Sequence, residues 1–151
     1  TISRCRQVRF TVPAADSFAT DLSPDAVSAA GRRPGLAVRL NDEPDELALR
    51  RSWGETFDRV LAADIPERLA LAKELASEER ITDILDEWIG LTRSALLPAG
   101  QAEPKTVTHL RKRYSQEQLS DHLHRLFAAR RRLRYNPNVQ LLIEQLLLRL
   151  A

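Results

Sequence analysis

The sequence contains no methionine, a single cysteine, and no hydrophobic run long enough to span a bilayer. One cysteine cannot form an internal disulfide, so the fold does not depend on an oxidising compartment. The chain also lacks a secretory signal, because no basic start is followed by an apolar stretch and a small-residue cleavage site. Since even position 1 is not methionine, we expect a fragment of a longer protein.

The composition that remains is that of a globular chain. Its 151 residues can hold one ordinary domain, or one domain with a small appendage. Apolar residues make up 43% and charged residues 29%, while the formal net charge is only +2. Such a weak overall charge gives no argument for nucleic-acid binding by the whole chain.

The most apolar stretch lies at residues 136–151. Asn136 followed by Pro137 predicts a helix start, with the asparagine as N-cap and the proline in the first turn. Leucines and other apolar residues then recur at three- and four-residue steps, while Leu141 and Leu148 fall off that stripe. A helix that is apolar on more than one face needs several neighbouring elements to bury it, so we expect this stretch to be the central helix of a helical bundle.

Most of the remaining sequence also predicts helices. Alternating residues predict a short strand over 1–12, which has no partner strand in the rest of the chain. A polar turn at 41–44 is the best domain boundary. Beyond it, long amphipathic patterns with short links favour an all-α antiparallel bundle over 45–151. Helix starts are predicted at Ser23-Pro24, after Pro34, and with Asp64 and Ser115 as N-caps; further helices are predicted at 45–63 and 78–97, and a single turn at 106–113.

No catalytic or metal-binding constellation emerges from the spacing. His122 and His124 point to different sides of a helix, and with His109 and Cys5 they give no ligand set; surface or boundary histidines are the simpler interpretation. The carboxylates of 42–46 and 83–87, including Asp83, Asp86 and Glu87, are most simply solvated charges. We therefore expect no enzyme activity and no cofactor in this segment.

Two basic runs bracket one predicted helix, at 111–113 and 130–132. Such clusters can neutralise phosphates, so direct DNA contact by Arg130, Arg131 and Arg132 is one hypothesis. However, cations in the last turn of a helix also oppose the negative end of its dipole, and no aromatic residues are interleaved for base stacking. We favour helix-end charges and rim contacts over DNA binding.

Three stretches together resemble the subunits of the bacterial DNA polymerase III clamp loader. Ser3-Arg4-Cys5 resembles the motif that ends their ATPase-like module, and 30–40 resembles a Gly-x-Pro-Gly-x-Ala segment of the lid. The stretch 136–150 looks like the last helix of the delta-prime subunit. The resemblance implies the end of an AAA+ module and a lid remnant at 1–44, then a collar domain at 45–151 that assembles subunits side by side.

The resemblance also implies roles for individual residues. An arginine at position 4 is ordinarily an ion-pair donor; in this family it would reach a neighbouring subunit's ATP site, the arginine-finger role. Gly35 stands where ATPase relatives carry a nucleotide-sensing arginine, which favours the non-hydrolysing delta-prime over gamma or tau. The subunit interface would include Leu142, Leu146, Leu147 and Leu150.

The implied partners are the gamma/tau and delta subunits through the collar, with the sliding clamp and primed DNA reached indirectly and no membrane involved. A cytoplasmic location follows from the same resemblance. Two alternatives remain open: the collar fragment of a gamma or tau ATPase subunit, and an unrelated helical adaptor or DNA-binding domain.

Overall fold

The computed structural model describes residues 21–31, 33–99, 103–135 and 137–150. Within these ranges every regular element is a helix, which confirms the all-α prediction. The strand predicted over 1–12 lies outside the described residues. The helices are α1 (Pro24–Ala30), α2 (Pro34–Asp42), α3 (Pro44–Ala62), α4 (Ile65–Ala76), α5 (Ile81–Leu96), α6 (Lys105–Arg113), α7 (Gln116–Arg132), the short 3₁₀ helix η2 (Leu133–Tyr135) and α8 (Val139–Arg149).

Side-chain caps begin the helices at three of the predicted positions. The hydroxyl of Ser23 accepts the Ala26 N–H at 3.2 Å, and the carboxylate of Asp64 accepts the Glu67 N–H at 3.0 Å. Ser115 and Gln118 form a reciprocal capping box at the start of α7. Each cap satisfies donors that the first turn leaves unpaired, so local sequence chemistry fixes where these helices begin.

The last helix begins later than predicted. Its N-cap is Asn138, whose side-chain oxygen accepts the Leu141 N–H at 3.0 Å, so Pro137 precedes the helix and is not its first residue. Asn136 lies outside the described residues. Of the two asparagines that flank Pro137 in the sequence, Asn138 is the one that accepts an N–H of the first turn. The segment 106–113 also differs from prediction, because α6 is a helix of nine residues and not a single turn.

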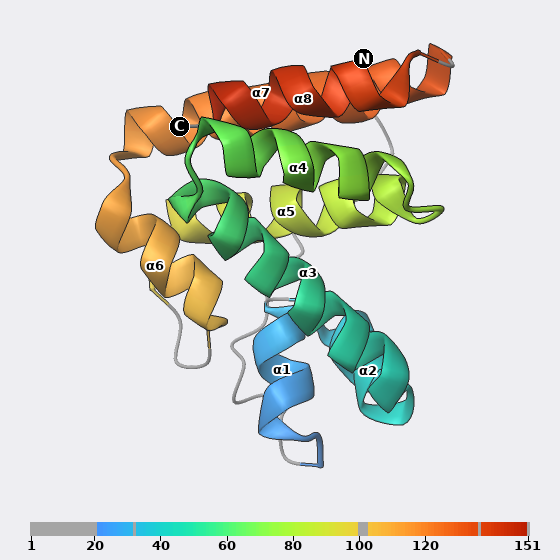
Figure 1. Cartoon of the computed structure of the whole chain (residues 1–151). Helices are drawn as coiled ribbons and strands as arrows, with labels where there is room; N and C mark the ends of the chain where they lie inside the picture. Colours follow the sequence, from blue (N-terminus) through green and yellow to red (C-terminus); the bar gives the residue numbers. More distant parts are fainter. Residues whose placement is uncertain (1–20, 32, 100–102, 136, 151) are drawn as a thin grey trace, which may run out of the picture.

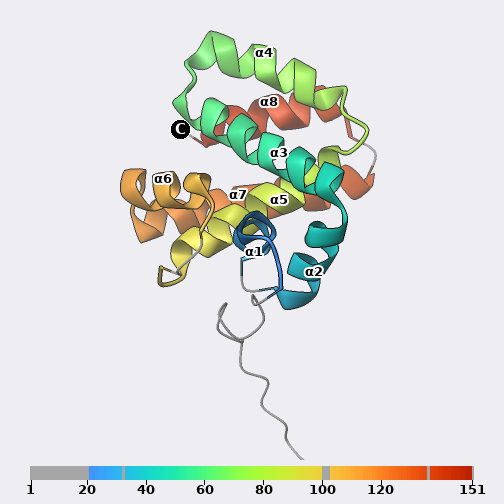
Figure 2. The ribbon, with the colours of Figure 1, turned by 90° about the horizontal axis from the view of Figure 1, so that it is seen from below.

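The helix at the centre of the bundle is α5, and not α8 as predicted. It packs against α3, α6 and α7, while α8 packs mainly along α4 and also contacts α7. Figures 1 and 2 show α5 between α3 and α7, with α8 alongside α4. Trp88 of α5 is fully buried. The prediction placed α8 at the centre because leucines fall on several of its sides, yet two of those leucines face outward.

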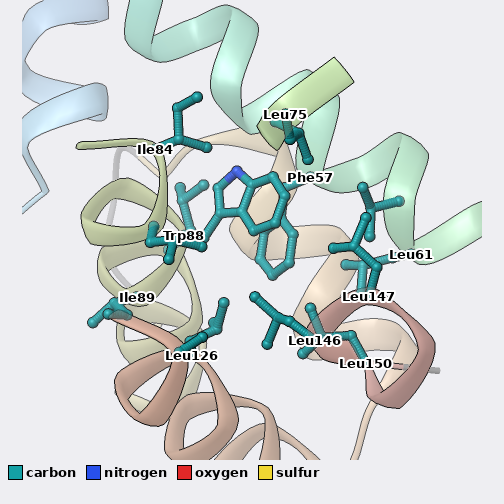
Figure 3. Packing of buried hydrophobic residues seen from close by; sticks show 14 of the residues in the cluster. Phe57, Leu61, Leu75, Ile84, Trp88, Ile89, Leu126, Leu146, Leu147 and Leu150 are labelled. Atoms are coloured by element: carbon teal, nitrogen blue, oxygen red, sulfur yellow. The ribbon is translucent and has the colours of Figure 1, made fainter. Parts of the chain in front are cut away.

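Aromatic packing joins α3 to α5 in the middle of the core (Figure 3). The rings of Phe57 and Trp88 stack with centroids 4.7 Å apart, and the Trp88 indole N–H donates to the Trp53 carbonyl at 2.9 Å. Leu146 and Leu147 of α8, with Leu150 immediately after it, converge on the same cluster. One core therefore holds the helices from α3 to α8.

A second, smaller cluster holds α1 and α2 together and against the start of α3. It consists of Ala26, Ala30, Ala37 and Leu40, with Leu47 of α3 packed against it. Gly31 ends α1 at φ +59°, a conformation that favours glycine, and its N–H donates to the Val27 and Ser28 carbonyls. A single residue, Glu43, separates α2 from α3. The domain boundary predicted at 41–44 stays a prediction.

An ion-pair network lies between α3 and α5. Arg50 donates to Glu87 at 2.5 Å and to Glu46 at 3.0 Å, and Glu46 in turn accepts from Arg80 at 2.9 Å. The prediction that the carboxylates of 83–87 are solvated is wrong for Glu87, which is 5% exposed. Burial raises the pKa of Glu87, while the positive charges of Arg50 and Arg33 oppose that rise. Arg50 therefore compensates a carboxylate that α5 carries into the interior.

Substitutions at two adjacent leucines test which side of α8 is buried. Leu147 is fully buried and Leu148 is 42% exposed. Leu147→Ala should lower the free energy of unfolding by about 2–5 kcal/mol, because it leaves a cavity in the core. Leu148→Ala should change it by less than about 0.5 kcal/mol. Urea unfolding followed by circular dichroism measures both, and equal losses would contradict this orientation of the helix.

Removing the partner of Glu87 should make stability depend on pH. Arg50→Met leaves a buried, unpaired carboxylate and should cost about 3 kcal/mol at neutral pH. The pKa of Glu87 in the folded variant then lies above the value of about 4.3 that it has in the unfolded chain. As the pH falls from neutral toward that value, Glu87 takes up a proton in the folded protein before it does so in the unfolded chain. The deficit relative to the parent should therefore shrink as the pH falls from neutral toward about 4.3, the unfolded value.

The double variant Arg50→Met/Glu87→Gln is the control for that experiment. It carries no buried carboxylate at this place, so it should regain part of the lost stability and lose the added pH dependence. Urea unfolding at several pH values gives both quantities. A deficit in Arg50→Met that stays constant across the pH range would show that Glu87 is not its cause.

Candidate subunit-interaction surface

Helix α8 has one buried side and one exposed side. Leu142, Ile143, Leu146 and Leu147 are buried, as is Leu150 immediately after the helix. Leu141 and Leu148, which are seven residues apart, are 51% and 42% exposed. Residues at this spacing lie on the same side of a helix. The outer side of the helix therefore presents two leucines to solvent, with the exposed Gln145 between them.

The four leucines predicted to form a subunit interface are interior residues. Leu142 and Leu146 are 7% and 4% exposed, and Leu147 and Leu150 are fully buried. They belong to the core cluster that includes residues of α3, α4, α5 and α7. Because their surface is already covered, the α8 side chains available to a neighbouring subunit are Leu141 and Leu148. That α8 contributes to an interface stays a prediction.

The first basic run acts mainly within the chain. Arg111 pairs with Glu103 at 2.6 Å and donates to the carbonyls of Ser94, Ala95 and Leu97, at the end of α5. Carbonyls in the last turn of a helix lack the N–H partner four residues on, and that of Ser94 accepts both from Arg111 and from the Leu97 N–H. Arg113 lies over the Tyr114 ring at 5.6 Å. Arg111 therefore contacts a helix end, that of α5 and not of its own helix, and the preference of this run for such contacts over DNA stays a prediction.

In the second basic run, one arginine pairs with a carboxylate of its own chain and the other two are exposed. Arg130 forms two hydrogen bonds with Asp86 of α5, at 2.8 and 2.9 Å, and so ties α7 to α5. Arg131 and Arg132 are exposed at the end of α7. Earlier in the same helix, Arg125 donates to the Arg149 carbonyl at the end of α8. Since Arg130 is already paired with Asp86, a phosphate would have to compete with this carboxylate, and DNA contact by Arg130 stays a hypothesis.

The three histidines have different surroundings. His109 and His124 are exposed, and the His109 ring nitrogen lies 3.5 Å from an oxygen of Asp58. His122 is 3% exposed, with its Nδ1 unpaired and its ring edge-on to Tyr114, so the interpretation of it as a surface residue is wrong. Burial, together with the charge of Arg125, lowers the pKa of His122. Among the described residues no group of three histidine, cysteine or acidic side chains could hold a metal ion.

The remaining candidate residues lie at the other end of the chain. Arg4 and the rest of the Ser3-Arg4-Cys5 motif lie outside the described residues, so the structure does not place the predicted arginine finger. Gly35 lies in the first turn of α2 and is exposed. An added Cβ there would meet nothing within 4 Å among the placed atoms, so packing does not explain the glycine.

Sequence reasoning missed the outward leucines and the buried charge. Leu141 and Leu148 were recognised as lying off the apolar stripe, and that observation could have identified them as surface residues. Glu87 carried a signal too, since it is flanked on α5 by Ile84, Leu85 and Trp88, all of which are buried. With buried residues on most of its circumference, α5 carries Glu87 inward, whereas Asp86 stays exposed.

Comparison with known proteins gives one family match. Residues 99–151, which contain α6, α7 and α8, match the model of the family described as DNA polymerase III, delta subunit, C terminal. No curated protein and no solved structure matches the chain. No helix in the described part of the chain is long and apolar enough to cross a membrane. The match covers the last third of the sequence. It supports the interpretation of the chain as part of a subunit of the DNA polymerase III clamp loader.

Proposed function

We propose that this chain is the C-terminal part of the delta-prime subunit of a clamp loader, and that its helices assemble the complex without catalysing a reaction. The observation that carries the proposal is the family match over α6, α7 and α8. That family description names the delta subunit. The choice of delta-prime rests on the resemblance of Ser3-Arg4-Cys5 and of residues 136–150 to that subunit.

The exposed apolar residues of α8 support an assembly role. Leu141 and Leu148 lie on the same side of the helix, and each leaves more than two fifths of its surface in solvent. Exposed leucines at helical spacing are typical of surfaces where helices meet. The partners are the gamma or tau subunits and the delta subunit, and their joint action places the sliding clamp on primed DNA in the cytoplasm.

A collar fragment from a gamma or tau subunit is the second candidate. It shares the Ser-Arg-Cys motif, so that motif does not separate the two. Gly35 favours delta-prime, because the resemblance places a nucleotide-sensing arginine at this position in the ATPase subunits. A Gly-rich phosphate loop ending in lysine and serine or threonine in the preceding sequence of the gene would favour the ATPase subunit instead.

Assembly can be tested with charged substitutions on the outer side of α8. The double variant Leu141→Asp/Leu148→Asp should lose co-elution with purified gamma or tau and delta subunits, because two carboxylates would be buried in the interface. Val38→Asp, at a residue of α2 that is 50% exposed, is the matched control and should co-elute like the parent. Circular dichroism verifies that each variant is folded.

Two results would count against this proposal. If the parent chain itself does not co-elute with the partner subunits at micromolar concentration, the assembly role is not supported. If the parent and the double variant co-elute equally well, assembly uses a different surface.

The role of Arg4 can be tested in the complete subunit within the reconstituted clamp loader. Arg4→Ala should reduce DNA-stimulated ATP hydrolysis by about 10³-fold at the one site that it serves, because the transition-state charge loses its planar cation. Arg6→Ala, two residues away, is the control and should leave turnover unchanged. Complex formation is measured in parallel by size-exclusion chromatography. Unchanged turnover with Arg4→Ala would assign this arginine a structural role.

A further inference from the structure

The end of α7 and the 3₁₀ turn that follows it carry two exposed aromatic side chains. Phe127 is 49% exposed, and Tyr135, the last residue of η2, is 79% exposed. The other aromatic rings in the described part of the chain belong to the core or pack against it: Trp53, Phe57, Trp88 and Tyr114. Within the described residues, exposed rings are therefore confined to one segment, 127–135.

The same segment carries positive charge that its own sequence does not balance. Residues 122–143 contain no aspartate or glutamate, but they contain five arginines: Arg125, Arg130, Arg131, Arg132 and Arg134. Arg130 pairs with Asp86 of α5. Arg131 and Arg134 are exposed, and neither forms an ion pair with another described residue. Two free guanidinium groups therefore lie within the segment that exposes the two rings.

Helical spacing places the Phe127 ring on the same side as these two arginines. Arg131 follows Phe127 by four residues and Arg134 follows it by seven, the steps that keep side chains on one side of a helix. Arg134 lies in η2, where residues three apart eclipse one another, so it stays in line with Arg131. Tyr135 stands at the end of this row, about 12 Å along the axis from Phe127. These four residues form the outer stripe of α7.

The rings, and not the charges, indicate the kind of ligand. Arginines in the last turn of any helix oppose the negative end of its dipole, so their presence alone identifies no partner. Proteins that bind single strands combine cations that contact the phosphates with aromatic rings on which unpaired bases stack. An acidic protein surface would use the arginines and leave the rings without a planar partner. In a duplex the bases are already stacked on one another and do not reach the rings.

We propose that the outer stripe of α7 binds single-stranded DNA, with bases stacked on Phe127 and Tyr135 and with phosphates paired to Arg131 and Arg134. The choice of DNA over RNA rests on the proposed function in replication, whereas the binding of a single strand does not. The run 130–132 contains no aromatic residue of its own. The rings lie one helical turn before it and just beyond it, and the structure brings one of them into line with the arginines.

The test is the fluorescence anisotropy of a fluorescein-labelled oligothymidylate of about ten nucleotides, titrated with the full chain at about 50 mM salt. The parent should bind with a Kd of about 10–100 μM. Phe127→Leu keeps an apolar side chain but removes the ring, so it should weaken binding at least about fivefold, as should Tyr135→Ala. Phe127→Tyr keeps a ring and should bind like the parent. Arg131→Gln and Arg134→Gln should each lower the slope of log affinity against log salt by about 0.7.

Matched controls lie on α2, which Figure 1 shows at the opposite end of the molecule from α7. Val38 is 50% exposed, and its neighbour Arg39 is exposed as well. Val38→Ala and Arg39→Gln should bind the oligonucleotide like the parent. Circular dichroism verifies the fold of each variant. The stripe variants should still co-elute with the partner subunits, so a failure of DNA binding is distinguished from a failure of assembly.

Four results would overturn the proposal. Equal binding by the parent and by Phe127→Leu would show that no base stacks on this ring. Equal losses in Arg39→Gln and Arg131→Gln would show attraction to positive charge without a defined site. Tighter binding of an oligouridylate of the same length would make RNA the ligand. Tighter binding of a glutamate-rich peptide, weakened by the same substitutions, would make the partner an acidic protein.

Discussion

The structure depends on the contact between α3 and α5 that Trp88 makes. Its ring stacks on Phe57 of α3, and its indole N–H donates to a carbonyl of the same helix. Burial of two large aromatic side chains supplies apolar contact, and the hydrogen bond fixes how the two helices are placed along one another. The other helices of the main bundle then add to this pair: α6 and α7 pack on α5, and α4 with α8 completes the core beside α3.

The positions of the paired charged residues follow from the packing around α5. An interior helix with polar residues on its buried side must compensate them, and α5 does so with arginines from three other parts of the chain. Arg50 of α3 pairs with Glu87, Arg130 of α7 pairs with Asp86, and Arg111 of α6 covers the carbonyls at the end of α5. Two of the six basic residues that suggested DNA binding, Arg111 and Arg130, are therefore cross-links between helices. Arg131 and Arg132 stay exposed at the end of α7.

Local chemistry predicted the elements better than it predicted their arrangement. Ser23, Asp64 and Ser115 cap their helices as their sequences indicate, because a cap needs only atoms within a few residues. The place of α8 could not be derived this way, since apolar periodicity shows that a helix is buried and not which helices bury it. For the same reason the periodicity predicts an interface at leucines that the fold buries, whereas Leu141 and Leu148, which lie off that stripe, are the exposed ones. The local sequence could not predict that the charge of buried Glu87 is compensated, because its partner Arg50 is far away in the sequence.

The pairing of α4 with α8 has a consequence for synthesis on the ribosome. The two helices pack along one another, yet roughly sixty residues separate the end of the first from the start of the second. At translation rates of about 5–20 residues per second, α4 is complete about 3–12 s before its partner exists. Its leucines must spend that interval without their final contacts. During that interval the nascent chain exposes Leu71 and Leu75, which the finished fold buries, and exposed apolar surface of this kind makes a folding intermediate prone to aggregation.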